Sequence, residues 1–158
     1  MKLTLLAVGR LRPAYRDAAD EYLLRLRRVG EVREVEVREA ARAGPPPVQR
    51  REEAKALRSA LPAGALRIGL DLRGEGWSSE ELARRLEGWR DGGRALAFLI
   101  GGAVGLEDAL LAETDHRWSL GPLTLPHELA RVVVVERLYR GFSILRGEPY
   151  HKGDDRGS

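Results

Sequence analysis

The sequence predicts an α/β fold in which a mainly parallel sheet carries helices on both faces. Three short apolar runs, at 2–8, 66–72 and 95–100, have the length and composition of buried strands. Amphipathic stretches with helical spacing separate these runs, and alternation of strands with helices is typical of parallel sheets. The 158 residues contain neither an internal repeat nor a domain linker, so we expect a single domain over 1–158.

Local signals set the bounds of the expected elements. Pro13 suits the first turn of a helix, Ser78 with Glu81 has the spacing of a capping box, and Gly44–Pro47 forms a stiff loop. The stretch 132–135 fits either a strand or the middle of a long helix. In chain order we expect strand 2–8, helix 13–29, a half-exposed strand at 35–37, helix 48–61, strand 66–72, helix 78–90, strand 95–100, helix 107–113, strand 118–120, helix 129–145 and a polar, mobile tail at 153–158.

The composition is that of an ordinary globular protein. Apolar residues make up 43% and charged residues 32%, and no apolar run is long enough to span a bilayer. The N-terminus lacks the layout of a signal peptide, so we expect a cytoplasmic protein with no membrane partner. The absence of Cys excludes disulfides, thiolate metal sites and thiol nucleophiles.

The positive charge comes almost entirely from Arg. The formal net charge is +3 with a pI of about 9.6, and Lys occurs only at positions 2, 55 and 152. Arg binds phosphate in a bidentate manner and stacks on bases, so this excess permits an RNA partner. A GC-rich coding sequence would produce the same excess.

A glycine-rich turn, Ile100–Gly105, follows the strand at 95–100. Glycines there let backbone approach a ligand closely, and open parallel sheets bind ligands beyond the carboxyl ends of their strands. Ile100 stands where a nicotinamide-binding fingerprint needs glycine, and the Lys-Ser/Thr ending of a P-loop is missing. A tight structural turn and a ligand-binding turn both fit this pattern.

Two further segments are candidates for the same cleft. Asp71 ends a predicted strand, where a carboxylate either faces a ligand or accepts hydrogen bonds from loop amides. The stretch 120–127 is apolar, irregular and framed by Pro122 and Pro126. Such a loop either packs inward or surrounds an apolar ligand with its backbone polar groups available.

The C-terminal segment combines aromatic and basic residues. Tyr150 and His151 can stack on an unpaired base, whereas Arg140 and Lys152 can hold phosphate. A solvated charged tail is the alternative. The three His residues lack metal-ligand spacing, so we expect no metal site.

Taken in order, these segments resemble a known family. The series is Leu99-Ile100-Gly101-Gly102-x-x-Gly105-Leu106, Trp118-Ser119-Leu120, Leu123-Thr124-Leu125-Pro126-His127-x-Leu129-x-Arg131-Val132, Glu136-x-Leu138-Tyr139-Arg140 and Gly147-Glu148-Pro149-Tyr150-His151-Lys152. Over residues 1–152 the chain is similar to the pseudouridine N3-methyltransferases of large-subunit (23S) ribosomal RNA, the RlmH type of the SPOUT superfamily. Ala103-Val104 replaces the Pro-Glu of many relatives, and Gly121-Pro122 stiffens a loop that often carries Ser.

The resemblance implies a fold and a cofactor. Family members have a deep trefoil knot in the C-terminal half, here about 66–152, which binds S-adenosylmethionine without a metal, and they form homodimers. The cofactor residues implied are Leu70, Asp71, Leu72, Gly102, Gly121, Pro122, Leu123, Thr124, Leu125 and Pro126.

The resemblance also implies the reaction. The family target is a pseudouridine in the 23S stem-loop at the subunit interface of the assembled ribosome. His151 is the first candidate for a group near the N3 proton, with Tyr150 and Arg140 beside it as catalytic candidates; Arg131, Arg140 and Lys152 are candidates for RNA binding. The alternatives are a SPOUT methyltransferase acting on tRNA and a non-catalytic ribosome assembly factor.

Overall fold

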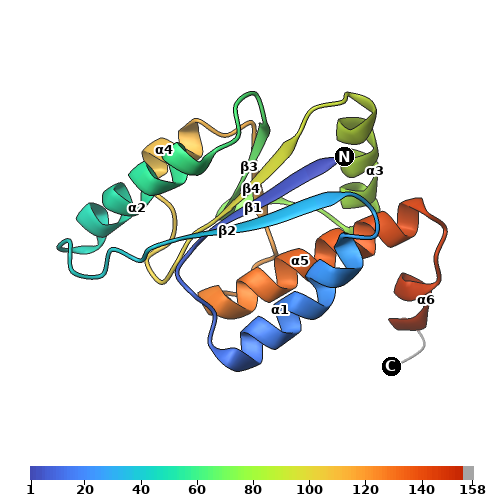
Figure 1. Ribbon diagram of the computed structural model, residues 1–158, viewed down its shortest axis with the longest axis horizontal. Coiled ribbons are helices and arrows are strands. Elements are labelled where there is room, and N and C mark those ends of the chain that lie inside the picture. The colour runs from blue at the N-terminus through green and yellow to red at the C-terminus, as the bar shows by residue number, and fades with distance from the viewer. Residues whose placement is uncertain (155–158) are drawn as a thin grey trace.

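A five-stranded sheet forms the centre of the structure, a computed structural model that describes residues 1–154 (Figure 1). The strands lie in the order β2-β1-β4-β3-β5, and every strand pair is parallel. The elements are β1 (Lys2–Val8), α1 (Pro13–Leu26), β2 (Glu31–Val37), α2 (Pro46–Ala60), β3 (Leu66–Gly76), α3 (Ser79–Asp91), β4 (Leu96–Ile100), α4 (Asp108–Ala112), β5 (His116–Ser119), α5 (His127–Leu145) and α6 (Tyr150–Asp154).

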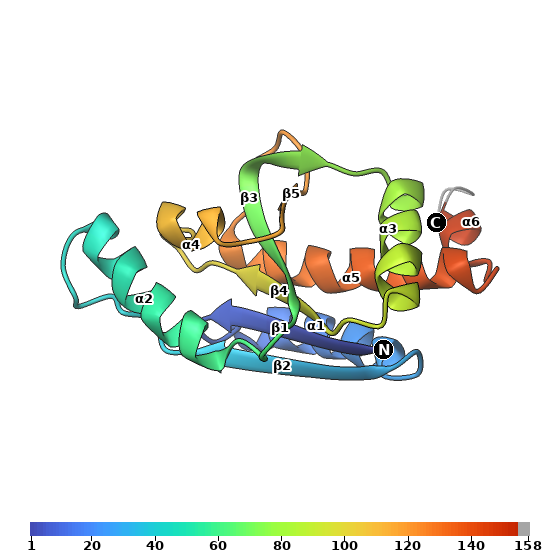
Figure 2. The same ribbon diagram turned by 90° about the horizontal axis from the view of Figure 1, so that it is seen from above.

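Helices cover both faces of the sheet, as the sequence predicts (Figure 2). On one face, side chains of α1, α3 and α5 pack against alternate residues of β1 and β4, among them Leu5 and Phe98. On the other face, α2 and α4 cover the intervening residues, among them Leu6 and Leu99. Because successive side chains of a strand point to opposite faces, a continuous apolar run is buried on both.

The predicted elements are confirmed, with shifts at their ends. The helix α2 begins at Pro46, because proline fits the first turn of a helix, where its missing N–H would be unpaired. The Ser78 side chain accepts a hydrogen bond from the Glu81 N–H at 3.1 Å and caps α3. The stretch 132–135 is helical, since α5 buries Val134 and Val135 against the sheet.

The strand β3 is longer than expected. It pairs with Trp118 of β5 first through Leu70 and again through Glu75, so the residues between form an irregular bend. Gly74 makes this bend possible, because a Cβ there would lie 2.6 Å from the Arg117 carbonyl oxygen. The segment that the sequence treats as a tail begins inside α6, and its last four residues lie outside the described part of the chain. No helix within residues 1–154 is long and apolar enough to cross a bilayer.

Candidate functional site

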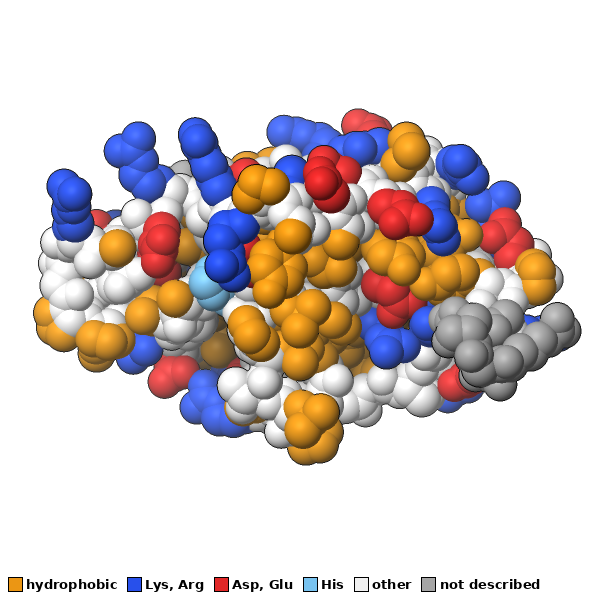
Figure 3. Space-filling model, turned by 90° about the horizontal axis from the view of Figure 1, so that it is seen from below, with side chains coloured by type: hydrophobic (Ala, Val, Ile, Leu, Met, Phe, Trp, Pro, Cys, Tyr) orange, Lys and Arg blue, Asp and Glu red, His pale blue; other side chains and the backbone are white. Residues whose placement is uncertain are grey.

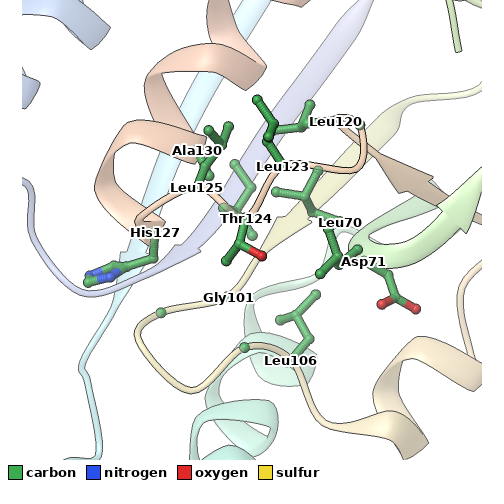
Figure 4. Close-up of a pocket in the computed structure, with 15 residues that line it drawn as sticks. Leu70, Asp71, Gly101, Leu106, Leu120, Leu123, Thr124, Leu125, His127 and Ala130 are labelled. Atoms are coloured by element: carbon green, nitrogen blue, oxygen red, sulfur yellow. The ribbon is translucent and has the colours of Figure 1, made fainter. Parts of the chain in front are cut away.

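A cavity opens at the carboxyl edge of the sheet, over the bend in β3 and the ends of β4 and β5 (Figure 4). Four segments far apart in sequence meet there: the bend in β3, the turn after β4, the loop after β5 and the start of α5. The lining residues are Leu70, Asp71, Leu72, Ile100, Gly101, Gly102, Gly105, Leu106, Leu120, Gly121, Leu123, Thr124, Leu125, His127 and Ala130. The three segments chosen from the sequence therefore surround one cavity.

The turn after β4 depends on its glycines. A Cβ on Gly101 would lie 2.6 Å from the carbonyl carbon of Gly105, and one on Gly102 would lie 3.0 Å from Val8 Cγ1. Gly105 has a φ of 76°, and its N–H donates to the Gly102 carbonyl oxygen at 3.1 Å. The turn is therefore folded tightly on itself, with bare backbone facing the cavity.

The loop after β5 presents polar backbone groups among apolar side chains. Gly121 has a φ of 129°, and its N–H donates to Ser119 Oγ at 3.2 Å, which fixes the start of the loop. From Leu123 to Leu125, the backbone N–H and C=O groups make no hydrogen bond within residues 1–154. The Leu123 side chain is 77% exposed. These groups are free to pair with the polar edge of a ligand whose flat face contacts the leucines.

Asp71 plays a different part from the leucines around it. Its Oδ1 accepts hydrogen bonds from the N–H and Nε of Arg73 at 3.1 and 3.3 Å, and Arg73 also bonds Asp108 at 2.8 Å. Figure 4 shows its carboxylate directed away from Gly101 and Thr124. Asp71 thus lines the cavity while its Oδ1 orders the bend in β3, the second of the two roles open from sequence.

The aromatic C-terminal residues form a separate cluster on α1, α5 and α6. The Tyr150 hydroxyl donates to Glu136 Oε2 at 2.9 Å and lies 3.3 Å from the Tyr22 hydroxyl. Arg140 bonds the same carboxylate at 2.9 Å, and its guanidinium lies 5.1 Å from the centre of the Tyr150 ring. Burial, followed by the hydrogen bonds to Tyr22 and Glu136, raises the pKa of Tyr150 strongly, so its phenol is a neutral donor at physiological pH.

Two further candidates lie beside this cluster on α6. Nδ1 of His151 is buried without a hydrogen-bond partner within residues 1–154, whereas Lys152 is exposed.

The cluster lies further along α5 than the cavity does. Ala130 lines the cavity and Arg140 belongs to the cluster, and ten residues of helix at 1.5 Å each separate them by roughly 15 Å along the axis. Tyr150, His151 and Arg140 are therefore not brought to the cavity of their own chain.

Arg131 does not fit the RNA-contacting role expected from sequence. Its side chain is 2% exposed and forms an ion pair with Glu36. It also donates to the carbonyl oxygens of Val8 and Gly9 at 3.1 and 2.7 Å. A guanidinium in this position cannot reach a phosphate at the surface, so Arg131 is a structural residue.

Most of the cofactor residues predicted from the sequence line the cavity. Pro122 and Pro126 frame the loop without lining the cavity, and the remaining eight line it. Ala130 was missed, because its place at the start of α5 emerges only when that helix packs under the loop, whereas His127 ends the stretch 120–127 that the sequence had singled out. Gly101 and Gly105 belong to the glycine turn that the sequence had singled out.

Comparison with known proteins gives the family. The family described as "Predicted SPOUT methyltransferase" matches residues 1–151. The chain belongs to this family of SPOUT methyltransferases. It is 43% identical over 155 residues to a Bordetella petrii protein named "Ribosomal RNA large subunit methyltransferase H", covering 96% of this chain and 99% of that one. A Rubrobacter xylanophilus protein of the same name is 48% identical over 155 residues, covering 95% and 98%.

Solved structures agree on the fold of this SPOUT chain. A probable methylase family protein from Haemophilus influenzae has a TM-score of 0.56 at 13% identity, covering 94% of this chain and 69% of that one. A probable methyltransferase from Bordetella pertussis also has a TM-score of 0.56, at 16% identity, covering 89% and 95%. At these identities the likeness establishes the fold alone.

Proposed function

We propose that this SPOUT methyltransferase transfers a methyl group from S-adenosylmethionine to N3 of a pseudouridine in 23S ribosomal RNA, within the assembled ribosome. Relatives named as ribosomal RNA large subunit methyltransferases match almost the full chain. The observation that carries the proposal is the cavity at the carboxyl edge, where free backbone groups of Leu123–Leu125 face the bare glycine turn. An enzyme of ribosomes works in the cytoplasm, where we place this one.

The cavity fits the cofactor chemically. Leu70, Leu106 and Leu125 offer apolar surface for the adenine ring, and the unpaired backbone groups of 123–125 offer donors and acceptors for its polar edge. Gly101 and Gly102 leave room that a Cβ would fill. Leu72, Gly121 and Thr124 complete the proposed binding set, which lies inside the proposed knotted part at about 66–152.

The reaction requires alignment and loss of one proton. The bound cofactor supplies an electrophilic methyl group on a sulfonium. The chain must hold the acceptor N3 in line with that group and exclude water, which contributes up to roughly 7–11 kcal/mol in ideal cases. The proton on N3 must leave, and the imidazole of His151 is the group we propose to receive it. Tyr150 and Arg140 hold the surrounding cluster together through Glu136.

We propose that a second copy of the chain completes the site. The cluster lies outside the cavity of its own chain, with Arg140 about 15 Å along α5 from Ala130, so a homodimer that opposes two α5 helices would bring one copy's cluster to the other's cavity. Figure 3 shows apolar side chains gathered over the face that carries α5. Leu129, on that helix, is 36% exposed, and Leu123 is 77% exposed in the adjoining loop. Apolar groups left in water on one face are typical of an interface.

Transfer of labelled methyl groups tests the reaction. Ribosomes that lack the modification and free 23S RNA are incubated in parallel with the enzyme and tritiated S-adenosylmethionine. We expect label on the ribosome, mapped to pseudouridine N3. Label on free RNA alone would retain the chemistry and reject the assembled ribosome as substrate. Cofactor binding without transfer to either would reject this substrate and make tRNA, or a non-catalytic assembly role, the next hypothesis.

Replacement of His151 tests the proposed proton acceptor. His151→Ala should lower the turnover number by about 100-fold or more, as for a lost general base, while the Kd of the cofactor changes little. Single-turnover transfer and calorimetric titration measure the two quantities. Turnover near that of the wild type would remove His151 from the mechanism.

A further inference from the structure

The carboxyl edge of the sheet has a second hollow beside the cofactor cavity. The cavity lies over the bend in β3 and the ends of β4 and β5, whereas this hollow lies over the ends of β1 and β2. It is lined by Gly9, Arg10, Glu36, Val37, Arg38 and Glu39. The strands β1 and β4 are neighbours, about 4.8 Å apart, so the two hollows adjoin along one edge.

We propose that this second hollow, with Arg10, Arg38 and the nearby Arg42, holds the phosphates that flank the target nucleotide. The inference rests on the proposed function, since it takes RNA as the substrate, and it adds a surface outside the cofactor site and the C-terminal cluster. Three features of the hollow support this role: its arginines lack acidic partners, their loops are held by hydrogen bonds, and the hollow lies beside the cavity.

The three arginines differ from most others in the chain because carboxylates do not neutralise them. Arg16, Arg58 and Arg73 each pair with two or more acidic side chains. Arg10, Arg38 and Arg42 are exposed, and none makes a side-chain hydrogen bond or ion pair within residues 1–154. A guanidinium without a partner retains its full charge and its bidentate donors for phosphate.

The acidic residues of the hollow do not cancel this charge. The Glu36 carboxylate is paired with Arg131 and lies 3.8 Å from Arg16. Glu39 is the remaining carboxylate of the lining. Within the lining, the two unpaired cations Arg10 and Arg38 therefore face one unpaired anion, Arg42 follows on the same loop, and the local balance favours a polyanion.

Both loops that carry the arginines are held in place by buried side chains. The buried Arg131 side chain donates to the carbonyl oxygens of Val8 and Gly9, the two residues that precede Arg10. Glu53, which is 2% exposed, accepts hydrogen bonds from the Ala40 N–H and from Gln49 Nε2, both at 3.0 Å. The loop between Arg38 and Arg42 is thus ordered before binding, which lowers the entropy lost when a phosphate is captured.

The position of the hollow suits an RNA strand that places a single base in the cavity. Gly102 lines the cavity and packs on Val8, two residues before Arg10. A nucleotide whose base reaches the cavity would leave its neighbouring phosphates over the ends of β1 and β2. Figure 3 shows Lys and Arg side chains projecting from the end of the molecule that carries the β2–α2 loop, beyond the apolar area.

Two double variants of equal charge test the proposal. Arg10→Gln with Arg38→Gln removes two cations from the hollow, and Arg27→Gln with Arg28→Gln removes two exposed, unpaired cations near the other end of α1. Thermal melting should leave both variants folded like the wild type, because all four side chains are exposed. Neither pair belongs to the cofactor site or the C-terminal cluster, so cofactor Kd and turnover at saturating RNA should be unchanged.

The readouts are the KM for RNA and the salt dependence of binding to ribosomes and to a protein-free 23S fragment. For the hollow variant we expect a KM raised roughly 10-fold, and a slope of log Kobs against log salt that falls by about 1.4–1.8, or 0.7–0.9 per lost phosphate contact. The control variant should remain near the wild type. Equal loss in both variants, or no loss in either, would overturn the proposal.

The same data separate this surface from the proposed reaction. Weaker binding of both RNA forms by the hollow variant supports the surface even if the wild type transfers no methyl group. Wild-type transfer together with an unchanged KM in the hollow variant would reject the surface and leave the reaction intact. Loss on ribosomes but not on the RNA fragment would indicate an acidic ribosomal protein and reject RNA as the partner of this surface.

Discussion

Gly101 offers a clean test of how the glycine turn shapes the cofactor cavity. Its φ lies outside the left-handed region, so alanine can adopt the backbone conformation and the effect of Gly101→Ala is purely steric. The added Cβ would lie 2.6 Å from the carbonyl carbon and 2.9 Å from the Cα of Gly105, and 2.9 Å from the Leu106 nitrogen. All three are backbone atoms, so the turn itself must open.

The structure gives the size and direction of the effect. Overpacking of this kind costs about 1–3 kcal/mol, and each kcal/mol lowers the Tm of a chain of this size by about 2–4 °C. Because Gly101 and Gly105 line the cavity, we also expect S-adenosylmethionine to bind at least about 10-fold more weakly, which corresponds to about 1.4 kcal/mol. Thermal melting and isothermal titration measure the two effects.

Gly88 is the matched control. It lies inside α3, and a Cβ there meets no atom within 4 Å. Gly88→Ala should raise the free energy of unfolding by about 0.8–1 kcal/mol, because alanine is the better helix former, and leave cofactor affinity unchanged. If Gly101→Ala bound cofactor like the wild type, the glycine turn would not be part of the cofactor site.

Two further predictions concern charge. Arg131→Met should lower the free energy of unfolding by about 1–3 kcal/mol, since it leaves the carbonyl oxygens of Val8 and Gly9 without this donor and removes the ion pair with Glu36; urea denaturation measures the loss, and adding Glu36→Gln should recover part of it. If the single variant is as stable as the wild type, these interactions of Arg131 contribute nothing. Hydrogen bonds from the Arg12 backbone and then from its side chain lower the pKa of Glu128 below its ordinary value of 4.5. The stability that this group contributes is therefore present above pH 4.5 and is lost as the pH falls through the lowered pKa. Urea denaturation between pH 3 and 7 should show a shallower acid limb for Glu128→Gln, and an identical limb would remove Glu128 from the cause.

The sequence predicted part of the candidate site. The difference between the residues it identified correctly and those it did not has a physical cause. Close approach of backbone requires glycine and irregular apolar loops are rare at a surface, so the turn at Gly102 and the loop at Leu123–Leu125 could be recognised by residue type. Arg131 could not be classified in this way, because an arginine that binds phosphate and one that pairs with a carboxylate and backbone carbonyls of its own chain have the same side chain. Only its burial beneath Gly9 decides between these roles.

The sequence by itself determined the α/β class, the strands and helices, and the segments that carry the site. These follow from apolar periodicity, from caps such as Ser78, and from glycine and proline positions, which act over a few residues. The tertiary structure alone decided the strand order, which places the bend in β3 and the ends of β4 and β5 around one cavity and the ends of β1 and β2 around a second. It also decided that Tyr150 bonds Glu136 in the middle of α5, outside the cavity of its own chain. Such relations depend on packing between residues far apart in sequence, which local sequence patterns do not specify.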